Sequence, residues 1–134
     1  MALTREAAPN RRGPPMSGEF GYAVAPGEIV YRGGIVALNA SMQAQRPQTA
    51  GSVVIVGIAD HTVDNRTGAA ATTERVVAMR GTFQAAVGAP TAAALGAPVY
   101  ATDDNTLTLA SGGGALLAGT LAGVESGLTY IRIG

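Results

Sequence analysis

The chain has 134 residues, a formal net charge of zero and only 13% charged residues. This length is sufficient for a single domain with its own core. The absence of cysteine excludes a disulfide framework, a thiolate metal site and a cysteine nucleophile, and electrical neutrality argues against binding to nucleic acid.

Small residues dominate the apolar part of the composition. There are 26 alanines and 19 glycines, but only two phenylalanines, four tyrosines and no tryptophan. Large aromatic side chains supply much of the buried area in small domains, and a freely soluble monomer usually carries more surface charge. We therefore expect a partner or self-association to contribute stability, although a GC-rich genome would also produce an excess of alanine and glycine.

The sequence contains no segment typical of secretion or of a membrane span. Residues 1–15 lack the apolar centre of a signal peptide. The longest nearly apolar run, residues 115–124, is about half as long as a membrane-spanning helix. We expect a soluble protein that is made in the cytoplasm and does not contact a membrane.

Residues 1–19 are predicted to form an extended arm. Prolines and glycines interrupt the segment, and no apolar period of two or 3.6 residues appears in it. Such a segment cannot order itself by burying apolar area, so we expect it to lie on its own domain or on another chain. Its candidate contact residues are Arg5, Arg11, Arg12, Pro14 and Pro15.

Residues 20–134 are predicted to form an all-β domain, either a small barrel or a sandwich. Short segments of strand-forming residues alternate with glycine, proline and Asp–Asn turns. In the last segment, alternation places Ile131 and Ile133 on a buried face and Tyr130 and Arg132 on the opposite face. The predicted strands are 22–25, 28–31, 35–38, 53–59, 75–79, 82–86, 98–101, 106–110, 116–124 and 128–133.

Two segments between these strands have a different character. Residues 91–96 follow a proline and end in glycine, which predicts at most one helical turn. Residues 60–74 are mostly polar and are predicted to form a long loop that is flexible or faces a partner.

Two clusters of polar residues are candidates for chemistry. Asp60, His61 and Asp64 are residue types that bind metals, but no second histidine accompanies them, which favours a solvated loop. Asp103 and Asp104 offer adjacent carboxylates to a hard cation, yet the strand patterns on both sides favour a turn. We predict no catalytic residue, no metal site and no cofactor.

The order of motifs in the C-terminal half is distinctive. Residues 96–134 contain Gly-x-x-Val-Tyr, an acidic turn, a threonine-rich strand, a glycine-rich turn, a Gly-x-x-x-Gly strand and a closing Arg-Ile. Together with PGEIVYRGGIVALN at 26–39, this order resembles the capsid cement or decoration proteins of tailed phages, over about residues 20–134. The matching positions are Gly96, Val99, Tyr100, Asp103, Thr106, Thr108, Gly119, Gly123, Arg132 and Ile133.

The resemblance implies a β-tulip or barrel-like domain without enzymatic activity. Such a domain would bind the outside of an assembled head, commonly as a homotrimer, and stabilise the lattice of the major capsid protein. We expect the arm to dock on that capsid protein, with Arg5, Arg11 and Arg12 setting its register. Gly119 and Gly123 are expected to allow close approach of another backbone at the oligomer interface.

Other functions remain open at this stage. A head fibre or a head–tail component would have a similar composition but few copies in each virion. A carbohydrate-binding β-module usually presents clustered exposed aromatic side chains, and the sequence shows no such cluster. A metal-dependent hydrolase would depend on His61.

Overall fold

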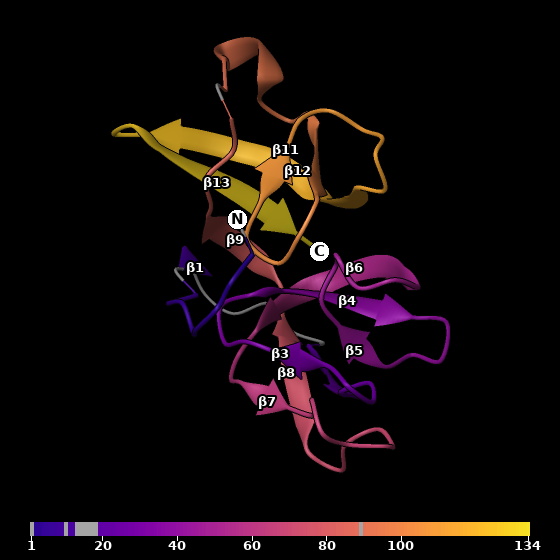
Figure 1. The fold of residues 1–134 in the computed structure, drawn as a ribbon. Coiled ribbons are helices and arrows are strands. Elements are labelled where there is room, and N and C mark those ends of the chain that lie inside the picture. Colours follow the sequence, from indigo (N-terminus) through magenta and orange to yellow (C-terminus); the bar gives the residue numbers. More distant parts are fainter. Residues whose placement is uncertain (1, 10, 13–18, 89) are drawn as a thin grey trace.

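The computed structural model describes residues 2–9, 11–12, 19–88 and 90–134 (Figure 1). Within these residues the protein is all β, with thirteen strands, one short 3-10 turn and no α-helix. The strands form three sheets whose pairings are antiparallel. The predicted fold class is thus confirmed, although none of the described sheets closes into a complete barrel.

Sheet A forms the upper half of the molecule in Figure 1. Its order is β1-β9-β13-β12-β10-β11. A single parallel bridge between Val87 and Leu107 brings the segment after β9 close to β11, so the sheet is strongly curled. The strands are β1 (Arg11–Arg12), β9 (Gly81–Gln84), β10 (Pro98–Ala101), β11 (Leu107–Thr108), β12 (Leu116–Glu125) and β13 (Leu128–Ile133).

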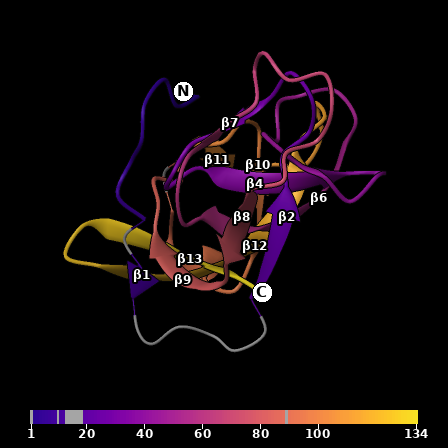
Figure 2. The ribbon, with the colours of Figure 1, turned by 90° about the horizontal axis from the view of Figure 1, so that it is seen from below.

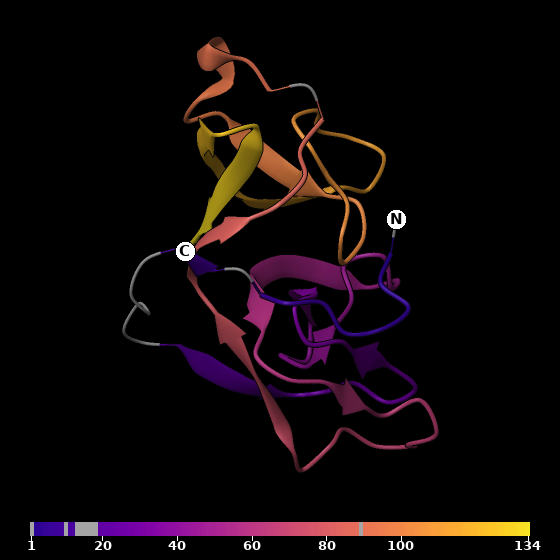
Figure 3. The same ribbon diagram turned by 90° about the vertical axis from the view of Figure 1, so that its left-hand side faces the viewer.

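Sheets B and C form the lower half (Figures 1 and 3). Sheet B has the order β2-β8-β6-β4-β5, and a parallel bridge between Val24 and Ala44 brings its two ends together. Sheet C is the pair β3-β7. The strands are β2 (Phe20–Ala23), β3 (Ile29–Val30), β4 (Ile35–Asn39), β5 (Ala44–Gln45), β6 (Ser52–Ala59), β7 (Val63–Asp64) and β8 (Arg75–Met79).

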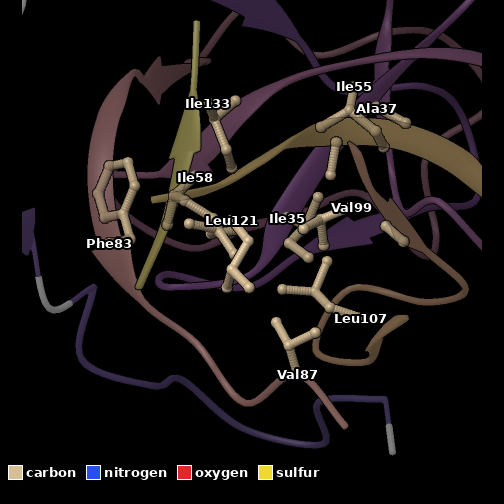
Figure 4. Close-up of a cluster of buried hydrophobic side chains, with 13 residues drawn as sticks. Ile35, Ala37, Ile55, Ile58, Phe83, Val87, Val99, Leu107, Leu121 and Ile133 are labelled. Carbon is tan, nitrogen blue, oxygen red and sulfur yellow. The ribbon is translucent and has the colours of Figure 1, made fainter. Parts of the chain in front are cut away.

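The main core lies between sheets A and B (Figure 4). Sheet B contributes Ile35 and Ile58, and sheet A contributes Phe83 and Leu121, all of which are buried. Ile131 and Ile133 are also buried in this cluster, as their alternation predicted. Because large aromatic side chains are scarce, branched aliphatic side chains supply most of the apolar contact between the two sheets.

A second core lies within the curl of sheet B and corrects one prediction. Val30 of β3 and Val63 of β7 are buried there against Val36 and Val76. Residues 60–74 are therefore not one continuous loop, because β7 interrupts them. The sequence did not indicate β7, because two residues are too few to show alternation and because its partner β3 lies far away in the sequence.

The remaining strand predictions hold, apart from their ends and two omissions. The 3-10 turn η1 (Ala92–Ala94) lies inside the predicted turn at 91–96. The short strands β1 and β5 were not predicted, and β1 lies within the arm. Both are two residues long and exist through pairing with β9 and β4. At the β12–β13 hairpin, Ser126 and Gly127 have φ values of 53° and 77°, the signs required by a type I′ turn.

Candidate functional site

The described part of the arm lies on its own domain (Figures 2 and 3). The amide of Leu3 donates to Oδ1 of Asp104 at 2.9 Å, and the amide of Ala7 donates to the carbonyl of Arg32 at 2.8 Å. Farther along, β1 pairs with β9 at the edge of sheet A. Of the two expected places for the arm, its own domain or another chain, this structure shows the first.

The arginines of the arm differ in their availability. Arg5 is exposed. Arg11 is half-buried, forms a salt bridge with Glu19 at 2.5 Å, and lies 5.4 Å from the centre of the Phe83 ring. Contact between Arg11 and a capsid protein would therefore require the arm to detach, whereas Arg5 is accessible in place. The backbone of Arg12 belongs to β1, and its side chain, with Pro14 and Pro15, lies outside the described residues.

Gly119 and Gly123 occupy different environments on β12. A Cβ atom at Gly119 would lie 1.9 Å from the carbonyl oxygen of Arg132. The close backbone approach at this glycine is therefore made by β13 of the same chain. Gly123 has no atom within 4 Å of its Cβ position and borders a shallow hollow of about 360 Å³, together with Val124 and Tyr130. Of the two glycines, Gly123 is the one with space for a second chain.

A groove of about 260 Å³ opens where sheets A and B meet. We call it the seam groove, and its lining residues are Phe20, Tyr22, Ile55, Val56, Ala78, Arg80, Ala118, Ile133 and Gly134. Most of these side chains are apolar. Phe20 is 62% exposed at the groove. An exposed aromatic side chain at the rim of a hollow can serve as an anchor for another protein.

The seam groove exists because β6 is only partly paired along one side. Its neighbour β8 pairs with β6 at Ile58 and Ala59 alone, whereas β4 pairs along nearly the whole strand. At Gly57 the two strands come close, since a Cβ atom there would lie 2.5 Å from the carbonyl oxygen of Met79. Before this point β6 diverges from β8, and Ile55 and Val56 line the opening. Unpaired strand edges are natural places for another chain to add a strand.

The acidic turn at 103–105 has a structural role. Oδ1 of Asp103 accepts the amide of Asn105 at 2.8 Å, as expected for an Asx turn. Asp104 turns inward and is 1% exposed. Its backbone carbonyl accepts the amide of Ile35, and its own amide donates to the side chain of Gln48. The two carboxylates therefore do not converge on one ion, and Asp104 connects the turn, the arm and sheet B.

Burial raises the pKa of Asp104 above its ordinary value, and the neighbouring charge of Asp103 acts in the same direction. The amide of Leu3 and the charge of Arg46 oppose this shift. Oδ2 of Asp104 is buried without a hydrogen-bond partner. Ionisation of this carboxyl would thus place a charge where only one of its two oxygens is satisfied.

We expect Asp104→Asn to flatten the dependence of stability on pH. The folded protein holds the Asp104 proton more tightly than the unfolded chain does. The contribution of this carboxyl to the free energy of unfolding is therefore largest below its ordinary pKa of 3.8 and falls as the pH rises through the folded pKa. An amide oxygen can still accept from Leu3 but carries no charge. Urea unfolding at pH 4, 5, 6 and 7 should show a smaller decline for the variant, which should equal or exceed the native stability at pH 7.

Asp64→Asn provides a control of opposite sign. The hydrogen bond from the Arg66 side chain lowers the pKa of Asp64 to about 2, so the stability that this group adds is present above pH 3.8 and is lost as the pH falls through about 2. Any stability that this variant loses should be the same at every pH between 4 and 7, so the slope of its curve should match the native slope there and differ only at more acidic pH. A decline between pH 4 and 7 that is the same in Asp104→Asn and in the native chain would refute the assignment.

The cluster around His61 does not assemble as a metal site. Nδ1 of His61 lies 2.7 Å from Asp60 Oδ1, and Nε2 lies 3.3 Å from Glu74 Oε2. Asp64 instead pairs with Arg66. Among the described residues, no group of three or more metal-binding side chains is placed to hold an ion.

Sequence reasoning missed Glu28, which holds together the loop after β5. Glu28 is 2% exposed, and its carboxylate accepts from Arg46 Nε at 2.8 Å, from the Arg46 amide at 3.1 Å and from the Thr49 hydroxyl. The loop that follows β5 is therefore fastened to the strand region around Ile29. Alternation could have indicated only that Glu28 is buried, because it shares its face with the buried Val30, and it gave no sign of the contact with Arg46.

Comparison with known proteins gives no family. The chain matches no protein-family model, and no curated protein is significantly similar to it in sequence. Within the described residues, no helix is long and apolar enough to cross a membrane.

Proposed function

We propose that this protein is a capsid decoration protein, which binds the outer surface of an assembled phage head and stabilises the lattice of its major capsid protein. The observation that carries the proposal is the seam groove with its exposed Phe20. This surface is suited to contact with another protein. The class of partner comes from the sequence resemblance to cement proteins, whose matching positions between Gly96 and Ile133 all belong to sheet A or its connecting turns.

The expected mechanism is stabilisation by binding. A protein that binds only the assembled lattice stabilises it in proportion to the logarithm of its concentration over the dissociation constant. Contact with several capsid subunits adds avidity, because the second contact becomes intramolecular. The decoration protein would act on the head as a homotrimer, with Gly123 near the contact between copies, and with Arg5 adding a charged contact to the capsid.

Phe20→Ser should weaken binding to heads by about tenfold, since an exposed aromatic anchor commonly contributes more than 1 kcal/mol to an interface. Heads of the source virus assembled without the protein would be mixed with the purified variant and sedimented, and the bound fraction would be measured against concentration. Leu95→Ser is the matched control, because Leu95 is 51% exposed directly after η1 and does not line the groove.

Circular dichroism would establish that both variants keep the native fold. Equal binding by Phe20→Ser and Leu95→Ser would remove the seam groove from the interface. Absence of head binding by the native chain would end the proposal as a whole. Copy number, counted by mass spectrometry of purified virions, separates a decoration protein from a head–tail component or a fibre, which would be present in few copies.

A further inference from the structure

The domain surface under the arm is shaped to receive an extended backbone. At Gly33 a Cβ atom would lie 2.0 Å from the carbonyl oxygen of Ala7, and at Gly34 it would lie 3.1 Å from the Leu3 side chain. Gly33 also has a φ of 82°, which favours glycine. Side chains at these two positions would push the arm away. We call this surface, with Asp104 and the edge of β9, the arm seat.

The arm fills its seat incompletely. A cavity of about 130 Å³ remains between Ala7 and Ala8 of the arm and a floor that contains Phe83 and Ile131 together with polar residues such as Gln84. The polar contacts of residues 2–9 with the domain are few, and one of them is the Leu3 amide on the buried carboxyl of Asp104. Small side chains over an unfilled cavity contribute little stabilisation. Residues 2–9 are therefore stabilised less than a strand of the core, and the other contacts of the arm are the β1–β9 pairing and the ion pair of Arg11 with Glu19.

If the arm left the domain, β9 would become an unpaired edge strand of sheet A. In sheet A, β1 is the outermost strand and pairs with β9. Without β1, the amides and carbonyls of β9 would form a free edge beside this cavity. Such an edge readily accepts an equivalent strand from another chain.

The contacts that the described residues of the arm make with its seat could also be made by the arm of a second copy. Their partners lie after residues 13–18 in the sequence: Glu19, Arg32, Thr62, Phe83 and Asp104. The stretch from Arg12 to Glu19 can span at most about 24 Å.

We propose that the described part of the arm, residues 2–9 and 11–12, is an exchangeable strap, which docks in the arm seat of a second copy of this chain when copies are brought together. Exchange of an identical segment conserves the contacts of the closed monomer and links the copies at little cost. This proposal goes beyond capsid binding and does not depend on it, since the partner is the chain itself.

Cysteine pairing tests the exchange cleanly because the native chain has no cysteine. Arg12 and Thr82 are direct cross-strand partners in the β1–β9 pair, so Arg12→Cys and Thr82→Cys place two thiols at disulfide distance wherever the arm docks. Equal amounts of the two single variants, one of them labelled with ¹⁵N, would be mixed at about 1 mM, incubated, oxidised and analysed by mass spectrometry. The control is Arg12→Cys mixed with Ser111→Cys, because Ser111 is exposed and precedes β12. We expect the yield of mixed disulfide from Arg12→Cys and Thr82→Cys to be about ten times the yield of this control, because docking raises the effective concentration of the thiols.

The double variant, Arg12→Cys with Thr82→Cys, checks the seat itself. At low concentration it should close an intramolecular disulfide, and circular dichroism should show the native strand content. If it closes while the mixed single variants give no more cross-linked dimer than the Ser111→Cys control, the arm stays on its own domain and the proposal is wrong. If the double variant folds but does not close, the seat is wrong and the proposal fails with it.

Discussion

Gly119→Ala is expected to lower the free energy of unfolding by about 3 kcal/mol, in the range of an overpacked core. The added methyl group would lie 1.9 Å from the carbonyl oxygen of Arg132, a backbone atom that cannot move without separating β12 from β13. These two strands form the centre of sheet A and carry Leu121 and Ile131 into the main core. Urea unfolding, followed by far-UV circular dichroism, measures the change.

Gly123→Ala is the matched control on the same strand. Its Cβ position has no atom within 4 Å, so this variant should unfold at nearly the native urea concentration. Comparison of the two variants also distinguishes a close approach within the chain from a close approach to another chain. If Gly119→Ala leaves the monomer as stable as the native chain and only alters sedimentation, its close approach is to another chain and the intrachain explanation is wrong.

Glu28→Ala is expected to cost about 3 to 5 kcal/mol of stability. The substitution removes the acceptor for the Arg46 side chain, the Arg46 amide and the Thr49 hydroxyl, and it leaves these donors in a partly buried site without their anion. The loop after β5 should loosen as a result. Thermal unfolding measures the loss of stability, and amide hydrogen exchange at residues 46–52 locates it.

Two further variants test whether loss of the buried carboxylate causes this loss of stability. Glu28→Gln keeps the shape and one acceptor oxygen, so its loss should be smaller than that of Glu28→Ala. Asp64→Ala removes the carboxylate from the exposed ion pair with Arg66 and should leave the midpoint of unfolding nearly unchanged, because solvent screens such pairs. A similarly small effect of Glu28→Ala would show that the buried carboxylate does not hold the loop.

Local patterns predicted the strands well. Alternation in β13 placed Ile131 and Ile133 on a buried face, and both lie in the main core. The predicted helical turn at 91–96 is also present as η1. These features depend on neighbouring residues and on turn chemistry, and so they can be read from the sequence.

The candidate site could be predicted only in part. The arm was recognised from its composition, but its seat depends on Gly33 and Asp104, which lie far from it in the sequence. The seam groove depends on where β8 stops pairing with β6, and no local pattern marks that point. Phe20 lay outside the predicted strand at 22–25, and nothing in the sequence marked it as exposed.

The sequence by itself determined that this protein is built from short strands and tight turns, because burial on one face of a strand repeats every second residue. The tertiary structure alone decided that one aspartate of the acidic turn is buried, that Glu28 and Arg46 meet, and that Gly119 touches its own β13. Each of these depends on contacts between residues that are distant in the chain, and such contacts are set by the packing of the sheets rather than by any residue's immediate neighbours.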